Sequence, residues 1–535
     1  MPTLYTSLLA SHDKFSPRAA KRKQYIPRSS VLAQGIDQIL SNHLKGASPA
    51  ATRKHKERER ARRKRIKIVV IGAGLAGLCA AFELRRSGYH VEIVEARHEV
   101  GGRTRIRKGI AGQKAMDAGA ELIGDNHPLW LHYKTRFGLQ FSEVKEYGNS
   151  PIRFHGRTLT WEQSKALNKE LGKLLKKLNG RAELILDPHE PWTNPDAKKL
   201  DKLSLVDWAN GVKCRESARY ALYEMMETDG GAPASKQSLL GVLAMIKGGG
   251  LNRFWKDTEL HRCKGGTQKL AFAFAKKLRS QGVKIHTCTQ VRGLHVKGSH
   301  VLVETWKLPE PEKGCETKPV TEGNGIVGPK LKAAFAILTV PPSAWKTVDS
   351  LSPRRLKNLL TRRRPQMGQN TKFLMGLKKR FWKNAALGPT LTEDGPIDLT
   401  WETTEADGKG DIGLVGFSGA GDAKKLSREF DEDPKLASKE VYKRLAPVYQ
   451  GIADKVLKSD FVNWPKMNWA KASYCFPRPG DVTRWGPIYK AGFGNRLFFA
   501  GEHTSWAFMG YMEGALTSGY RVATRIALRD TLGIG

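Results

Sequence analysis

Apolar and polar positions divide the chain into a polar leading segment and a body with regular elements. Residues 1–65 contain few periodic apolar positions and are predicted to form a basic N-terminal arm. Residues 66–71 form a short β-branched run, residues 78–84 carry apolar positions at helical spacing, and residues 91–94 alternate. This order predicts a strand, a turn, a helix and a second strand of a parallel sheet.

Further elements follow from the same periodicities. The pattern predicts helices over residues 161–178 and 270–278, and strands over 283–286, 301–305, 334–340 and 497–501. We expect only a turn between the strands 283–286 and 301–305. Residues 309–330 are rich in Pro, Gly, Glu and Lys and predict a long surface loop. The last helix is predicted to begin near Tyr511.

The turn after the first strand carries a Gly-x-Gly-x-x-Gly motif made by Gly72, Gly74 and Gly77, with Ala76 inside it. The first glycine allows a tight turn, the second lets the backbone approach a pyrophosphate, and the third lets helix and strand pack closely. The following helix N-terminus supplies amide donors to phosphates. Glu95 ends the second strand and is predicted to accept hydrogen bonds from ribose hydroxyls. The alternative is an ordinary glycine turn.

The residues that follow the ribose-binding acid distinguish FAD from NAD. The segment 95–104, Glu-Ala-Arg-His-Glu-Val-Gly-Gly-Arg-Thr, resembles the matching segment of the flavin amine oxidase family. The resemblance implies that FAD is the cofactor and that the Gly-Gly-Arg loop wraps its pyrophosphate. Ala96, Arg97, Gly102 and Arg103 stand at the matching places. A flexible glycine pair followed by a bidentate cation suits a phosphate.

A segment near the C-terminus extends the resemblance. Residues 497–504 and 510–515 are similar to the family's second flavin-binding segment, in which a helix N-terminus faces the flavin ring. A helix dipole at that place stabilises negative charge on the reduced ring. The resemblance implies further cofactor contacts at Gly119, Ala120, Val291, Gly501, Glu502, Tyr511 and Met512.

The active-site residues are also implied by resemblance. Residues 369–376, Gln-Asn-Thr-Lys-Phe-Leu-Met-Gly, resemble the strand that carries the family's active-site lysine, so Lys372 is expected to lie at the flavin. A cation there would promote the reaction of reduced flavin with oxygen. Tyr511 matches one of two aromatic residues that face the flavin in relatives. The second aromatic residue is left open among Trp464, Trp469 and Tyr474.

The substrate is less well defined. The resemblance implies hydride transfer from a primary amine to flavin N5, with oxygen as acceptor and hydrogen peroxide, ammonia and an aldehyde or 2-oxo acid as products. L-amino-acid oxidases of the family carry an arginine that binds the substrate carboxylate, and Leu122 stands at that place. Glu121 beside it either attracts a substrate ammonium or holds a loop. Both amines and L-amino acids therefore stay open as substrates.

Two further points bear on the function. Relatives with covalently bound FAD use a cysteine whose place falls on Lys471 here, while Cys475 lies too near the matching Phe-Pro, so we predict noncovalent FAD. Three alternatives to the oxidase remain: an amino-acid monooxygenase or decarboxylase, a polyamine oxidase, and a non-catalytic flavoprotein that binds polyanions through the arm.

The motifs predict an α/β protein with two interleaved domains. A discontinuous, Rossmann-like FAD-binding domain is expected from residues 66–125, 255–345 and 475–535. A mixed α+β substrate-binding domain is expected from residues 126–254 and 346–474, with a helical subdomain in the first of these segments. The active site should lie between the two domains, over the flavin ring.

The composition bears on nucleic-acid partners, metal sites and membrane segments. The chain has 535 residues and a net charge of +39, of which the arm contributes +12, and the remaining excess is spread along the body. A diffuse excess is weak support for a nucleic-acid partner. The six cysteines form no Cys-x-x-Cys pair, so no metal site is predicted. No apolar run is long enough to cross a bilayer and no signal peptide is recognised, so we expect a cytoplasmic protein. Separately, we expect the protein to assemble as a homodimer.

Overall fold

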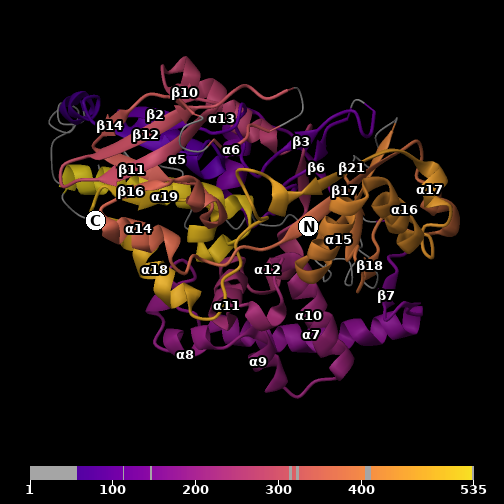
Figure 1. Cartoon of the computed structure of the whole chain (residues 1–535). Coiled ribbons are helices and arrows are strands. Elements are labelled where there is room, and N and C mark those ends of the chain that lie inside the picture. Colours follow the sequence, from indigo (N-terminus) through magenta and orange to yellow (C-terminus); the bar gives the residue numbers. More distant parts are fainter. Residues whose placement is uncertain are drawn as a thin grey trace.

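The structure is a computed structural model of the chain (Figure 1). It describes residues 57–112, 114–144, 147–312, 316–320, 325–403 and 411–532. The fold is mixed α/β, with one parallel sheet of five strands, further sheets of mixed or antiparallel pairing, and a separate layer of helices. Within the described residues, no helix is both long enough and apolar enough to span a membrane.

The parallel sheet has the strand order β10-β2-β1-β15-β22, and every neighbouring pair in it is parallel. Its strands are β10 (Lys284–His286), β2 (His90–Val94), β1 (Lys67–Ile71), β15 (Phe335–Leu338) and β22 (Leu497–Phe499). The central strands are apolar on both faces and buried, as expected for a parallel sheet covered by helices on both sides. The sheet therefore brings together parts of the chain that are more than 400 residues apart.

Helices cover this sheet, and two of them begin at its carboxyl edge. The helices of this region are α5 (Leu75–Arg86), α6 (Pro128–Phe137), α13 (Gln268–Ser280), α14 (Arg354–Thr361), α18 (Asp481–Ala491) and α19 (Met512–Leu532). The helix α5 connects β1 to β2 and packs along α19. Both α5 and α19 begin directly after a strand of the parallel sheet or the turns that follow it, so both N-termini lie at the carboxyl edge of the sheet.

The last part of the predicted arm packs on this domain. Residues 57–63 are helical, and Arg62 Nη2 lies 2.7 Å from Asp530 Oδ2 near the end of α19. Arg63 is only 3% exposed and donates a hydrogen bond from Nη1 to the carbonyl oxygen of Ser87. These residues of the predicted basic arm therefore pack against the body, because their guanidinium groups find acceptors there. Residues 1–56 of the arm lie outside the described residues.

A second sheet corrects the predicted turn between 283–286 and 301–305. It contains β11 (Thr289–Val296), which pairs antiparallel with β12 (Val301–Lys307) and parallel with β16 (Ser350–Ser352). The short strands β13 (Ile326–Val327) and β14 (Leu331–Ala333) also pair with β12. The strand β11 escaped the pattern because Thr, Gln, Arg, Gly and His interrupt its apolar positions.

The third sheet has seven strands in the order β21-β17-β20-β19-β18-β7-β8. Its strands are β21 (Val456–Asn463), β17 (Asn370–Leu377), β20 (Ile412–Gly419), β19 (Leu399–Glu402), β18 (Thr392–Glu393), β7 (Ile152–Phe154) and β8 (Arg157–Thr158). The helices α15 (Ala420–Glu432), α16 (Pro434–Leu445) and α17 (Ile452–Lys455) accompany it. The strand β17 is paired on both sides and fully buried. The two strands β7 and β8 come from the segment that was expected to be mainly helical.

The remaining strands form two small sheets. One pairs β3 (Ile106–Arg107) with β4 (Met116–Asp117), and the other has the order β5-β9-β6. Its strands are β5 (Leu122–Ile123), β9 (His261–Cys263) and β6 (Phe141–Glu143). These short pairs hold the loop after β4 in register with β9, which fixes the residues around Glu121.

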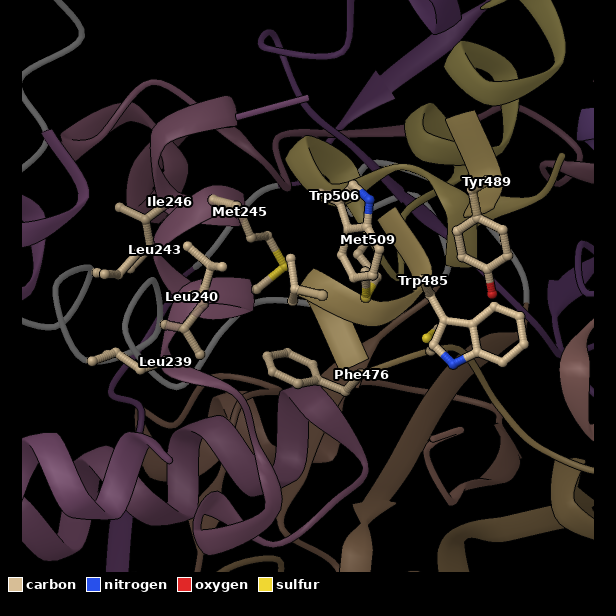
Figure 2. Close-up of a cluster of buried hydrophobic side chains, with 14 of the residues drawn as sticks. Leu239, Leu240, Leu243, Met245, Ile246, Phe476, Trp485, Tyr489, Trp506 and Met509 are labelled. Atoms are coloured by element: carbon tan, nitrogen blue, oxygen red, sulfur yellow. The ribbon is translucent and has the colours of Figure 1, made fainter. Parts of the chain in front are cut away.

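A helical layer lies apart from the sheets, at the bottom of Figure 1. Its helices are α7 (Trp161–Glu183), α8 (Ala197–Lys202), α9 (Leu205–Asn210), α10 (Glu216–Gly230), α11 (Leu239–Gly248) and α12 (Asn252–Asp257). Thr160 and Gln163 form a capping box that starts α7. The apolar helix α11 is buried on nearly all sides and packs against Trp506 and Met509 of the C-terminal segment, as Figure 2 shows. This apolar contact joins the helical layer to the segment that precedes α19.

Candidate active site

One cavity collects nearly all of the residues that the sequence predicted for the site. Of the predicted residues, only Gly77 is not part of its wall. The predicted residues in the wall are Gly72, Gly74, Ala76, Glu95, Ala96, Arg97, Gly102, Arg103, Gly119, Ala120, Glu121, Leu122, Val291, Lys372, Trp464, Trp469, Tyr474, Gly501, Glu502, Tyr511 and Met512. The cavity runs from the carboxyl edge of the parallel sheet to the strand β17 of the seven-stranded sheet.

The end of the cavity at β1 and α5 leaves backbone amide groups open to the cavity. The helix α5 begins after Gly74 with no side-chain cap, so its first amide groups are not covered by the protein's own side chains. The loop at Gly101 and Gly102 forms a bridge to Gly74. A Cβ atom added at Gly74 would meet no atom closer than 4.0 Å, which leaves open space on that face. A Cβ atom at Gly77 would instead collide with the carbonyl oxygen of Gly72, so Gly77 serves packing.

Glu95 is held by backbone amides at the end of β2. Its Oε2 accepts a hydrogen bond of 2.6 Å from the amide of Ala73, and its Oε1 accepts one of 2.9 Å from the amide of Arg97. Burial raises the pKa of Glu95, although these two amides and the charge of Arg97 act in the opposite direction. Arg97 Nη1 donates to the carbonyl oxygen of Gly102, which ties this corner to the glycine loop.

Arg103, predicted to neutralise phosphate, is ion-paired within the protein. Its Nη1 donates to the carbonyl oxygen of Ser473 and to Glu502 Oε1, each at 2.7 Å. Glu502 also accepts hydrogen bonds from the amides of Cys475 and Gly510. The Glu502 carboxylate therefore holds three loops together at the cavity, and the described contacts of Arg103 involve only Nη1, which carries two of its five N–H hydrogens.

Part of the predicted surface loop lines the cavity, which corrects that prediction. Glu316 Oε1 lies 2.9 Å from Arg105 Nη1 and is part of the cavity wall. Thr317 is 1% exposed, and its Oγ1 accepts a hydrogen bond of 2.8 Å from Trp469 Nε1. These contacts anchor a loop with a surface-like composition over the cavity, because the buried Arg105 requires a counter-charge.

Lys372 is the centre of a buried cluster at the other end. It lies on β17 and is 4% exposed. Its Nζ donates to the carbonyl oxygen of Asp117 at 3.1 Å and to Glu121 Oε2 at 3.0 Å. The same ammonium lies 5.0 Å from the ring centroid of Trp401, within the range of a cation–π contact. Two of its three N–H donors are thus accounted for, and Lys372 faces the cavity.

Glu121 is bound by the protein itself. Arg262 Nε donates to its Oε1 at 2.8 Å, and Trp401 Nε1 lies 3.1 Å from each of its oxygens. Burial alone would raise the pKa of Glu121, but the charges of Lys372 and Arg262 lower it. Burial and the charge of Glu121 raise the pKa of the neighbouring Asp117. Of the two predicted roles for Glu121, this geometry favours the one that holds the surrounding structure in place.

Two tyrosines face the cavity close together. A Cβ atom at Gly510 would lie 3.3 Å from the ring of Tyr474, so the residue before Tyr511 is in contact with that ring. Burial raises the pKa of both phenols, which keeps them neutral. Trp464 donates from Nε1 to the carbonyl oxygen of Ala118. Of the three aromatic candidates, Tyr474 is thus the one whose ring contacts the residue next to Tyr511.

Two acids that the sequence analysis did not select also line the cavity. Asp229 lies at the end of α10, and Glu259 lies between α12 and β9 and is 6% exposed. Burial and the charge of Glu259 raise the pKa of Asp229 far above its usual value. Asp229 Oδ1 is buried and has no hydrogen-bond partner among the described residues. No local motif marks either residue.

A comparison with models of known protein families identifies the family of the chain. The model for flavin-containing amine oxidoreductases matches residues 75–527. The chain belongs to the flavin-containing amine oxidoreductase family.

Two relatives in this family are distant in sequence but align over most of their length. The chain is 24% identical over 474 residues to a probable flavin-containing monoamine oxidase A of Dictyostelium discoideum, which covers 86% of this chain and 96% of that protein. It is 26% identical over 482 residues to a flavin-containing amine oxidase of Oncorhynchus mykiss, which covers 86% of this chain and 85% of that protein.

Solved structures agree with the fold. A triple mutant of putrescine oxidase superposes with a TM-score of 0.74 at 21% identity, over 87% of this chain and 99% of the other. Cyclohexylamine oxidase from Brevibacterium oxydans superposes with a TM-score of 0.72 at 21% identity, over 86% of this chain and 98% of the other. The α/β architecture with its parallel and mixed sheets is thus shared with amine oxidases.

The family implies a flavin, and the residues present fit FAD. The uncapped start of α5 and the open face of Gly74 suit the pyrophosphate. Glu95 and Val291 line the cavity beside that end, where the adenosine would lie. The start of α19 at Met512 lies in the wall nearer to Tyr511, where a helix dipole would face the flavin ring. Within the described residues, no group of three or more His, Cys, Asp or Glu suits a metal ion.

Proposed function

We propose that the protein is an FAD-dependent oxidase of primary amines, with oxygen as acceptor and hydrogen peroxide, ammonia and an aldehyde as products. The observation that carries the proposal is the buried Lys372–Glu121 ion pair, which lies in the same cavity as the uncapped start of α5 and as Tyr474 and Tyr511. The names of the relatives, which are monoamine, putrescine and cyclohexylamine oxidases, support oxidation of an amine.

The protein groups have separable tasks in this reaction. Bound FAD would accept a hydride from the carbon next to the amine nitrogen and pass the electrons to oxygen. Tyr474 and Tyr511 would hold the amine between their rings and exclude water, which fixes the direction of the C–H bond. Lys372 would present a fixed positive charge where negative charge develops. None of these tasks requires a side chain to take up a proton from the reacting carbon.

The cavity wall favours a substrate without a carboxylate. The basic residues of the described wall are Arg97, Arg103 and Lys372, and each already contacts acceptors of the protein. Leu122, at the place of the arginine in L-amino-acid oxidases, is apolar and 5% exposed. A carboxylate in the cavity would therefore lack a bidentate partner, and the desolvation of an unpaired charge is costly.

Noncovalent FAD is part of the proposal. Cys475 is buried outside the cavity wall, and its Sγ lies 3.2 Å from the carbonyl oxygen of Gln366. No cysteine is found among the wall residues that the structure describes. Heat denaturation followed by removal of the protein should release all of the yellow cofactor into solution.

The oxidase is tested by adding amines and L-amino acids to the purified flavoprotein. Mixing without oxygen should bleach the flavin absorbance with primary amines, and admission of air should restore it and release one peroxide for each amine consumed. Bleaching by an L-amino acid with release of carbon dioxide or an amide product would instead support the monooxygenase or decarboxylase alternative.

A further inference from the structure

Residues 316–320 form a segment, here called the strap, at one end of the cavity. Glu316 is part of the cavity wall, and its Oε1 lies 3.5 Å from Arg97 Nε. The amide of Arg97 in turn donates to Glu95, the acid that is expected to bind the adenosine ribose. The strap therefore lies at the end of the cavity where the adenosine of FAD would be held.

Two buried arginines hold the first residue of the strap. Glu316 Oε1 lies 2.9 Å from Arg105 Nη1, and the side chains of Arg97 and Arg105 are 4% and 3% exposed. The other oxygen of Glu316, Oε2, accepts a hydrogen bond of 3.0 Å from the amide of Asn468. Both arginines lie between β2 and β3, whereas Asn468 follows β21. The Glu316 carboxylate therefore connects two segments that are distant in the sequence.

Thr317 makes a second bridge between the same two segments. Its hydroxyl group donates to the carbonyl oxygen of Ala96 at 2.9 Å and accepts a hydrogen bond of 2.8 Å from Trp469 Nε1. Its carbonyl oxygen accepts hydrogen bonds from Trp469 Nε1 and from Asn468 Nδ2. Ala96 and Trp469 are wall residues, whereas Thr317 is not among the described residues of the wall. Thr317 therefore joins two parts of the wall without lining the cavity itself.

The far end of the strap is held by polar contacts as well. The amide of Val320 donates to Gln290 Oε1 on β11 at 3.0 Å, and Lys318 between the two ends is exposed. None of the described strap residues is a member of a hydrophobic core cluster. A segment with few buried apolar contacts can open at a low cost in free energy while the rest of the fold stays intact.

We propose that the strap is a gate for the cofactor, which must open before FAD enters or leaves the cavity. The opposite end of the cavity is closed by β17, which is paired on both sides and fully buried. Opening at the strap breaks the contacts of Glu316 and Thr317 and leaves every strand pair of the sheets intact. The inference rests on the noncovalent FAD of the proposed function, but it does not depend on which substrate is oxidised.

The gate is tested through the rate and the equilibrium of FAD release from the holoenzyme. Thr317→Val removes the hydroxyl bridge to Ala96 and Trp469 but keeps the shape of the side chain. A gate that opens more often lets FAD leave and rebind faster. We therefore expect koff to rise about tenfold and Kd to change by less than about threefold. Both are measured from the fluorescence of free FAD after dilution of the holoenzyme.

A second variant and a control act on the same loop. Asn468→Ala removes the side-chain contact with the carbonyl oxygen of Thr317 and should raise koff about fivefold, with the same small change in Kd. Glu310→Gln is the matched control, because Glu310 is an exposed acid of this loop, and it should leave both quantities unchanged. Urea unfolding of each variant verifies that the fold is retained.

The possible results separate a gate from other roles. An unchanged koff in both Thr317→Val and Asn468→Ala would show that FAD leaves without opening of the strap. A koff that rises in the same proportion as Kd would show that these residues support bound FAD and do not gate it. FAD that stays attached to the denatured protein would overturn noncovalent binding and the gate together. Failure of every amine to reduce the flavin would overturn the oxidase and leave the gate standing.

Discussion

Lys372 Nζ and Glu121 Oε2 lie 3.0 Å apart, and both side chains are almost completely buried. Lys372 lies on β17 and Glu121 lies in the loop between β4 and β5, 251 positions away in the sequence. Arg262 and Trp401 bind the same carboxylate. The pair therefore fixes the position of the lysine at the cavity, and its geometry depends on contacts that only the folded chain brings together.

Replacing Lys372 by methionine should slow the reaction with little effect on cofactor binding. The variant removes the fixed charge but keeps an unbranched side chain on β17, and loss of one electrostatic contact at a reacting centre costs about 100-fold in turnover. Stopped-flow measurement of flavin reduction and reoxidation would locate the slow step. Lys379→Met, an exposed residue near the end of the same segment, is the control and should be unchanged.

Replacing Glu121 by glutamine should destabilise the protein. Lys372 and Arg262 would stay buried without their shared counter-charge, and breaking a buried pair costs about 3 kcal/mol. Urea unfolding monitored by tryptophan fluorescence would measure the loss. Glu432→Gln, a change of an exposed acid on α15, provides a surface control, and equal stability of the two variants would show that the carboxylate is not a structural counter-charge.

Gly74→Val should prevent FAD binding without unfolding the chain. Gly74 has a φ of −74°, which valine adopts, and a Cβ atom there points into open space rather than into the protein. The side chain would occupy the face on which the pyrophosphate must approach the backbone. We expect at least tenfold weaker FAD binding. Gly172→Ala, in open space on α7, is the control; normal FAD content in Gly74→Val would contradict the phosphate site.

His503 should make the protein sensitive to mild acid. It is 1% exposed, and neither ring nitrogen has a hydrogen-bond partner among the described residues. Burial, with a smaller effect of the charge of Arg103, lowers the pKa of His503 to about 3. The unfolded chain takes up a proton near pH 6.5 and the folded chain does not, so stability is present above that pH and is lost as the pH falls towards 3.

A variant isolates that contribution. His503 packs against the rings of Trp345 and Tyr489, so His503→Phe keeps an aromatic ring in place. Between pH 6.5 and pH 5 the native protein should lose about 2 kcal/mol more stability than the variant, as measured by urea unfolding at each pH. Equal losses in the two proteins would show that His503 titrates normally.

The residues that line the cavity at β1 and α5 could be selected from the sequence. The Gly-x-Gly-x-x-Gly turn, Glu95 and the Gly-Gly-Arg loop are short motifs, because a phosphate-binding turn needs residues that are neighbours in the chain. The parallel strands were predictable for a similar reason, since they are continuous apolar runs. The strand β11 was missed because its inward positions alternate with Gly, Arg and His.

The substrate end was less predictable from the sequence. Asp229 and Glu259 stand on different elements, and each resembles an ordinary surface acid in its local context. Arg262 and Trp401 likewise carry no motif, although both donate hydrogen bonds to the Glu121 carboxylate. The loop at Glu316 has the composition of a surface loop and is held over the cavity by contacts that include those with Arg105 and Trp469. Such contacts arise from the tertiary fold and leave no periodic signal.

In the proposed function, this cavity holds FAD and oxidises an amine. The most direct measurement mixes the purified flavoprotein with primary amines under strictly anaerobic conditions and then admits oxygen. We expect an amine to bleach the flavin, and oxygen to restore the absorbance with release of one hydrogen peroxide per amine consumed. A flavin that stays oxidised with every primary amine tested would contradict the proposed amine oxidase.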